Sequence, residues 1–239
     1  MMLRRWILLV FGVIGGLLTA TVLYISAESS MAIPAVDTEV PTILLTEEPI
    51  NSMEFPVAVP GTALIAQRVS AYDGPFLEDK SDREVIGVAA LLVYNGGSKE
   101  IALAQVTLQY GDNTYSFIGE NIPANGLVVL LEQDVKPYRS DAPNSCNGWQ
   151  IVSDSEGADC DLIAVTDVGM GSFLVTNLSE RLLNNVCIYY KSWLSPPDIY
   201  VGGISYRVTI SQLLPGQKIY IDPEHYAVGY SKVVSVTVE

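Results

Sequence analysis

A short acidic run in the second half of the chain is the first place where residue types could do chemistry. Asp154, Glu156, Asp159 and Asp161 lie close together around Gly157. Alternating carboxylates on a loop are the ligands that a hard cation such as Ca²⁺ takes. The run lacks the Asp-x-Asp-x-Asp-Gly spacing of an EF-hand, so two interpretations stay open: a Ca²⁺ site or a solvated acidic loop. We expect no other cofactor.

The single histidine of the chain, His225, lies beside Asp222 and Glu224 between two expected strands. An imidazole next to carboxylates could act as a general base. No nucleophile or metal-ligand spacing accompanies it in the sequence. We therefore expect a locally hydrogen-bonded loop histidine and a protein that is not an enzyme. The alternative, a hydrolase, predicts a concave site that gathers His225 with carboxylates from distant strands.

Aromatic side chains are frequent between residues 189 and 206. Tryptophan and tyrosine on an exposed sheet face can stack on sugar rings or anchor a partner protein. On a strand, however, every second side chain points into the core. The sequence thus allows either a recognition surface for a glycan or a surface protein, or core packing. The residues concerned are Tyr189, Tyr190, Trp193, Tyr200 and Tyr206.

The three cysteines allow one structural hypothesis. Cys146 and Cys160 flank an expected strand and a polar turn, so a hairpin there could bring the two sulfurs within bonding distance. Oxidation requires an exported location. Two states stay open, a disulfide bond or two free thiols. Cys187, between two apolar residues of an expected strand, is interpreted as a buried small residue.

The N-terminal segment has features that would place the rest of the chain relative to a membrane. Residues 6–25 are uncharged and largely apolar, and Arg4 and Arg5 precede them. Twenty helical residues at ~1.5 Å each span about 30 Å, the thickness of a bilayer core. The pattern predicts a transmembrane anchor over residues 1–27, with the N-terminus in the cytosol and residues from about 28 outside. The alternative is a signal peptide cleaved near Ser30-Met31-Ala32, which would give a secreted protein.

Residues 28–60 are expected to form an extended tether. The segment holds five prolines and six acidic residues but no lysine or arginine. Proline removes backbone donors and like charges repel, so this composition favours an extended chain. The whole chain has 27 acidic against 13 basic residues and a formal net charge of −14. That balance excludes nucleic acid as a natural partner, because phosphate neutralisation needs a basic face.

From residue 60 onward the apolar residues recur with a period of two, and the turns carry Gly, Asn, Asp and Pro. This pattern predicts strands, and no window shows a convincing helical stripe. The fold class is therefore all-β. The expected strands are Thr62–Ala71, Val85–Tyr94, Ile101–Tyr110, Thr114–Ile118, Leu127–Glu132, Trp149–Ser153, Leu162–Val168, Ser172–Asn177, Leu183–Lys191, Tyr200–Ile210, Lys218–Ile221 and Lys232–Val238.

The strands repeat in order. A strand ends in Leu-Val-x-Asn at Asn95 and again at Asn177, and Tyr115 and Tyr206 each open a later strand that ends at a proline-containing turn. Such a repeat indicates tandem duplication. The order resembles that of immunoglobulin-like modules in exported bacterial surface proteins of uncharacterised function. The resemblance covers most of residues 60–239 and implies two tandem β-sandwich modules, 61–155 and 156–239. A single larger sandwich is the alternative.

The sequence thus predicts a non-catalytic, membrane-anchored surface or envelope protein that acts as a binding or spacer module. Two alternatives remain open for the exported part: a carbohydrate-binding module that uses the aromatic residues between 189 and 206, and a subunit of an envelope complex. The expected partners are the membrane, through the N-terminal helix, and a surface protein or glycan.

Overall fold

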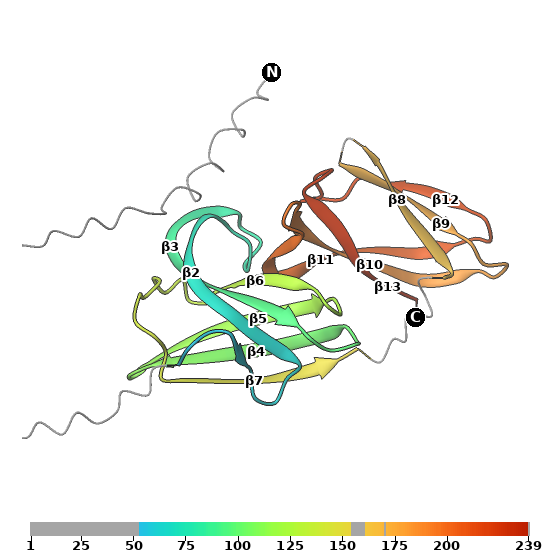
Figure 1. The fold of residues 1–239 in the computed structure, drawn as a ribbon. Coiled ribbons are helices and arrows are strands. Elements are labelled where there is room, and N and C mark those ends of the chain that lie inside the picture. Colours follow the sequence, from blue (N-terminus) through green and yellow to red (C-terminus); the bar gives the residue numbers. More distant parts are fainter. Residues whose placement is uncertain (1–52, 154–160, 170, 239) are drawn as a thin grey trace, which may run out of the picture. The chain divides into compact units, whose positions relative to one another are not determined.

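A computed structural model describes residues 53–153, 161–169 and 171–238 of the chain. Within these ranges the chain is all-β and contains no helix, which confirms the expected fold class (Figure 1). The strands are β1 (Val57–Ala58), β2 (Leu64–Phe76), β3 (Arg83–Asn95), β4 (Ile101–Tyr110), β5 (Asn113–Ile122), β6 (Leu127–Leu131), β7 (Ser145–Val152), β8 (Ile163–Gly169), β9 (Ser172–Asn177), β10 (Leu183–Leu194), β11 (Ile199–Leu213), β12 (Lys218–Ile221) and β13 (Ser231–Val238).

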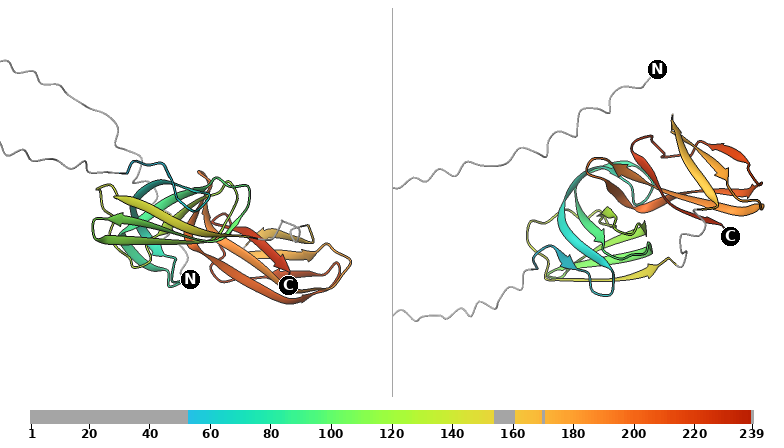
Figure 2. Two further views of the ribbon diagram at one scale, coloured as in Figure 1. Left: turned by 90° about the horizontal axis from the view of Figure 1, so that it is seen from below. Right: turned by 45° about the vertical axis from the view of Figure 1, so that its right-hand side comes forward.

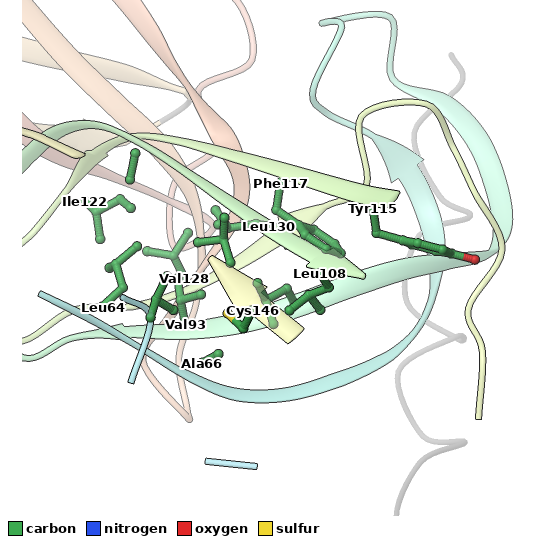
Figure 3. Packing of buried hydrophobic residues seen from close by; sticks show 14 of the residues in the cluster. Leu64, Ala66, Val93, Leu108, Tyr115, Phe117, Ile122, Val128, Leu130 and Cys146 are labelled. Atoms are coloured by element: carbon green, nitrogen blue, oxygen red, sulfur yellow. The ribbon is translucent and has the colours of Figure 1, made fainter. Parts of the chain in front are cut away.

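The first seven strands pack as two layers. β1, β2, β3 and β6 are neighbours in one sheet, and β5, β4 and β7 form another. Alternate residues of β4 are buried, so its inward face meets the facing sheet. Figure 3 shows Leu108, Phe117 and Leu130 gathered between the strands, and none of the three is exposed to solvent. We call strands β2–β7 the first repeat.

The remaining strands form a second pair of layers, which Figure 2 shows from two further directions in orange to red. β12, β9 and β8 make one sheet, while β11, β10 and β13 lie side by side in the other. Phe173, Val175, Val186, Ile188 and Leu213 form the centre of the core between them. We call strands β8–β13 the second repeat.

The two repeats share strand order and pairing register. The order β2-β3-β6 matches β8-β9-β12, and β5-β4-β7 matches β11-β10-β13. Three pairs of residues that face each other across strands of the first repeat have counterparts in the second. The matching pairs are Tyr94 with Leu127 and Thr176 with Lys218, Ile101 with Ile122 and Leu183 with Leu213, and Leu108 with Tyr115 and Tyr190 with Tyr206.

A buried asparagine organises the same corner in each repeat. The Asn95 Nδ2 donates hydrogen bonds to the carbonyl oxygens of Lys99, Ile122 and Pro123. The Asn177 Nδ2 donates to those of Arg181 and Leu213. Both side chains are almost fully buried, so these bonds satisfy polar groups that water does not reach. Each asparagine thus ties two turns together at one end of its repeat.

One strand pairing joins the repeats. β6 and the first residues of β11 run parallel, with Val128 opposite Tyr200 and Val129 opposite Val201. The sheet therefore continues from one repeat into the other, in the order β1-β2-β3-β6-β11-β10-β13. β11 can reach β6 because the β10–β11 hairpin is longer than its counterpart, the β4–β5 hairpin.

Some sequence predictions fall on parts of the chain that are not described. The anchor (residues 6–25), the cleavage site at 30–32, most of the tether and the acidic run from 154 to 160 lie outside the described residues. The boundary predicted between residues 155 and 156 lies there as well. Among the residues that are described, no helix is long and apolar enough to cross a membrane.

Candidate functional site

The most unusual side chain in the described part of the chain is Lys191 on β10, which is fully buried. Its Nζ donates hydrogen bonds to the carbonyl oxygens of Gly203 and Ile204, each at 2.7 Å, and of Gly202 at 3.3 Å. These carbonyls come together because β11 bulges opposite Lys191, where the register shifts. Burial lowers the pKa of Lys191 to about 8, although the carboxylates of Glu78, Glu120 and Glu100 oppose that shift.

Glu78, from the β2–β3 loop of the first repeat, binds the other side of the same backbone segment. Its carboxylate accepts hydrogen bonds from the backbone N–H groups of Gly203, at 2.8 Å, and Ile204, at 3.2 Å. It also accepts one from Leu131 on β6, at 2.8 Å. Burial raises the pKa of Glu78, and these three backbone hydrogen bonds, together with Lys191, oppose the rise.

Two successive peptide groups therefore lie between opposite charges. In each, the carbonyl oxygen (Gly202, then Gly203) accepts from Lys191 and the N–H (Gly203, then Ile204) donates to Glu78. The peptide dipoles are aligned with the field between the ammonium and the carboxylate, which stabilises both charges without a direct ion pair. We call this arrangement the peptide bridge. It connects a loop of the first repeat with two strands of the second.

Two further glutamates of the first repeat lie near the bridge. Glu120 on β5 accepts a hydrogen bond from the backbone N–H of Ser205 at 3.0 Å. Glu100, in the β3–β4 loop, hydrogen-bonds the Ser235 side chain of β13, and burial raises its pKa to about 6. Gly203 is required at the centre, because a Cβ built there would lie 1.8 Å from the carbonyl oxygen of Ile118 on β5.

His225 also takes part in contacts between the repeats. Its Nδ1 lies 2.8 Å from the Asp82 carboxylate of the β2–β3 loop, which makes an ion pair when the imidazole is protonated. The imidazole stacks on Tyr206, with ring centroids 4.7 Å apart. The sequence predicted a local hydrogen bond, whereas the observed partner is distant in the chain. Asp82 is the one carboxylate paired with it among the described residues.

The hydrolase alternative predicted a concave site around His225. A pocket of about 180 Å³ lies on the first repeat, and His225 is not among the residues that line it. Arg139 at its rim is already paired with Asp141, Nη2 to Oδ2 at 2.8 Å. The pocket is lined by Phe55, Arg68, Val69, Tyr110, Tyr138, Arg139, Ser140, Asp141, Ala142 and Pro143.

The aromatic residues singled out in the sequence divide between interior and surface. Tyr190 is 3% exposed and Tyr200 is 7% exposed, so both rings are packed inside. Tyr189 and Trp193 are half-buried. The Trp193 Nε1 donates to Asp198, and the Lys232 Nζ lies 5.0 Å from the Trp193 ring centroid. A glycan could reach only the half-buried rings, and binding there stays a prediction.

The expected metal and disulfide sites are mostly outside the described residues. Asp154, Glu156 and Asp159 are not described, and Asp161 is exposed. The described residues contain no cluster of side chains able to hold a metal ion. Cys146 is buried, and burial raises the pKa of its thiol to about 11. Its proposed partner, Cys160, lies outside the described residues, so the disulfide stays a prediction.

Sequence reasoning missed the peptide bridge. Lys191 follows a run of apolar and aromatic residues, Val186 to Tyr190, with one cysteine among them. A lysine at the end of such a run indicates the end of a buried strand, because lysine is almost never buried without a partner. The signal that could have found it is the glycine pair Gly202-Gly203 in an expected strand, since glycine there often marks a bulge or a close backbone approach.

Comparison with protein-family models, with curated proteins and with solved structures finds no match to this chain. The interpretation of the site therefore rests on its own geometry: buried charges that link two repeats, and no described cluster of catalytic groups.

Proposed function

We propose that the chain is a non-catalytic, membrane-anchored surface or envelope protein whose two repeats form one stiff module outside the membrane. The observation that carries this proposal is the peptide bridge. Lys191 and Glu78 are held from opposite sides of the same two peptide groups. Such a junction resists bending, because any separation would expose a buried charge without its partners. A stiff module is suited to hold a binding surface at a fixed distance from a membrane.

The proposal includes immunoglobulin-like architecture for each repeat. It is supported by the matching strand order and register, and by the two asparagine corners. These features are expected of tandem duplication of one sandwich. Duplication that kept the core and altered one hairpin would explain how β11 came to pair with β6.

Location and orientation are tested together in cells that express the full chain with a C-terminal tag. We expect the chain in the membrane fraction, with the tag digested by protease added outside the membrane barrier. A variant without residues 1–27 should stay in the cytosol with its tag protected. Recovery of the full chain in the soluble cytosolic fraction would refute the proposal.

Stiffness is tested with one spin label in each repeat, at the exposed positions Ile86 and Val168, in the purified full chain. We expect one narrow distance distribution. The Glu78→Gln variant removes the negative charge from the bridge and should broaden it, whereas Glu180→Gln, at an exposed glutamate of the second repeat, should not. A broad distribution in the unaltered chain would contradict the proposed stiffness.

A further inference from the structure

Strand β12 and the turns at the end of the second repeat that Asn177 organises expose several large apolar side chains. Tyr220 on β12 is 73% exposed, and Leu214 in the β11–β12 turn is 57% exposed. Leu178 and Leu182, in the β9–β10 loop, are also exposed. The hydrogen bonds of Asn177 to Arg181 and Leu213 hold the two turns at the same end. We call Leu178, Leu182, Leu214 and Tyr220 the Asn177 surface.

The matching end of the first repeat is covered. The pairing of Leu127 with Tyr94 and of Lys218 with Thr176 places Val129 of β6 in register with Tyr220. In the first repeat the free side of β6 receives the first residues of β11, with Val128 opposite Tyr200. Glu100, the counterpart of Leu182, binds Ser235. The pairing of β11 with β6 thus shows which kind of strand can bind to this edge of a repeat.

No strand of the described chain covers β12 in the same way. β12 pairs with β9 on one side, and in the ranges described no strand lies on the other. An uncovered edge presents unpaired N–H and C=O groups and is a template for another strand. In the first repeat the corresponding edge is paired, so the two ends differ in what occupies them.

We propose that the free edge of β12 binds an extended, uncharged apolar strand of a partner protein, added parallel to β12 as β11 is added to β6. This inference rests on the proposed function, because it names the kind of partner that the proposed module binds. Backbone hydrogen bonds would supply affinity, and contacts with the Asn177 surface would supply specificity.

The strand that occupies β6 defines the chemistry of the partner. Residues 199–202 of β11, Ile-Tyr-Val-Gly, carry no charge. A second copy of the chain is not the source of such a strand, because its own Tyr200 is buried in the core of its first repeat. Releasing the strand there would expose Tyr200 and break the peptide bridge, which makes the exchange unfavourable.

The test uses a fluorescently labelled peptide with the sequence of residues 199–205, Ile-Tyr-Val-Gly-Gly-Ile-Ser, and the purified full chain in detergent. We expect saturable binding by fluorescence anisotropy. Replacing Tyr220 and Leu214 together by aspartate should weaken binding at least about tenfold. Ile86→Asp is the matched control, because Ile86 is also exposed, at 87%, but lies on the first repeat. It should bind like the unaltered chain.

Hydrogen exchange locates the bound peptide. We expect new protection at residues 218–221. Protection at residues 127–131 instead would mean that the peptide displaces β11 from β6, and it would overturn the proposal. Absence of binding, or equal binding by the aspartate variant, would do so too. Self-association that the Tyr220 and Leu214 substitutions abolish would assign the edge to a second copy and refute a partner strand. These measurements do not depend on where the chain is located in the cell. Failure of the strand-binding proposal can therefore be distinguished from failure of the proposed membrane location.

Discussion

The two repeats are alike at their asparagine corners and different at their central hairpins. Asn95 and Asn177 make corresponding hydrogen bonds at corresponding positions. The β4–β5 hairpin, by contrast, ends in a short polar turn, while β10–β11 extends to pair with β6. The comparison teaches that buried polar groups fix the register of a repeat, whereas hairpin length decides what the repeat can reach.

The same contrast holds for one pair of side chains. Gln109 on β4 is only half-buried and donates to the nearby carbonyl oxygen of Gly111. Its counterpart by register, Lys191, is fully buried and donates to three carbonyl oxygens of β11. A position that is solvent-facing in one repeat thus becomes the centre of a junction in the other. Five substitutions separate what the repeats share from what differs between them.

The largest effect is expected from Gly203→Ala. The new Cβ would lie 1.8 Å from the Ile118 carbonyl oxygen, so β11 must move away from β5. We expect a loss of about 3 kcal/mol in the free energy of unfolding. The measurement is urea denaturation. Gly96→Ala is the control, since its Cβ would meet its nearest atoms at 3.6 Å. Unchanged stability of Gly203→Ala would show that the close approach is not required.

Next in size are Asn95→Ala and Asn177→Ala. Each leaves buried carbonyl oxygens without a donor, which costs about 2 kcal/mol or more. We expect the two losses to agree within about 1 kcal/mol, because two donated hydrogen bonds correspond between the repeats. Denaturation curves of the two variants test this. A large effect of one and none of the other would contradict the equivalence of the corners.

Lys191→Met should alter the pH dependence of stability more than stability itself. The pKa of Lys191 is lowered from 10.5 to about 8 in the folded chain, so the unfolded chain binds the proton more tightly. Stability should therefore rise as pH increases from about 8 towards 10, and the methionine variant should lack that rise. Near pH 7 we expect a loss of about 1 kcal/mol. Gln109→Met, at the matching position, should show the unaltered pH profile.

The smallest effect is expected from Glu100→Gln. Burial raises the pKa of Glu100 from 4.5 to about 6, so the folded chain binds this proton more tightly than the unfolded chain. The contribution of Glu100 to stability is therefore greatest below pH 4.5 and is lost as pH rises through 6. In urea denaturation at several pH values, the free energy of unfolding of the glutamine variant should fall less steeply between pH 4.5 and 6. An unchanged slope would indicate that Glu100 is solvated.

Much of the fold could be predicted from the sequence. Alternation of apolar and polar residues placed β4, β9 and β12 with their observed bounds. That pattern is local, because it depends on which side of one strand faces the core. The expected end of β10 at Lys191 was wrong by three residues, since the strand continues to Leu194. From sequence alone, a charged residue is predicted to face solvent unless its partners are known.

The junction could not be predicted in the same way. Glu78 and Gly203 lie far apart in sequence, and their contact depends on how one repeat packs on the other. The sequence around Glu78 alternates acidic residues with Lys80 and Arg83, a mixture of charges that is typical of a solvated surface loop. In the structure, Asp79 does pair with Arg83, while Glu78 in the same loop is directed inward. Adjacent residues with the same charge thus have opposite environments, which no local pattern distinguishes.

The peptide bridge also makes Lys191 a chemical reporter. Amine-directed reagents need a deprotonated, accessible nitrogen, and this one is enclosed by three backbone oxygens. Acylation of Lys191 would therefore proceed only while β11 moves away from the Lys191 Nζ, whereas exposed lysines such as Lys218 would react at once. The rate of acylation of Lys191 would therefore report how often this part of the protein opens, in a purified sample or in an intact cell.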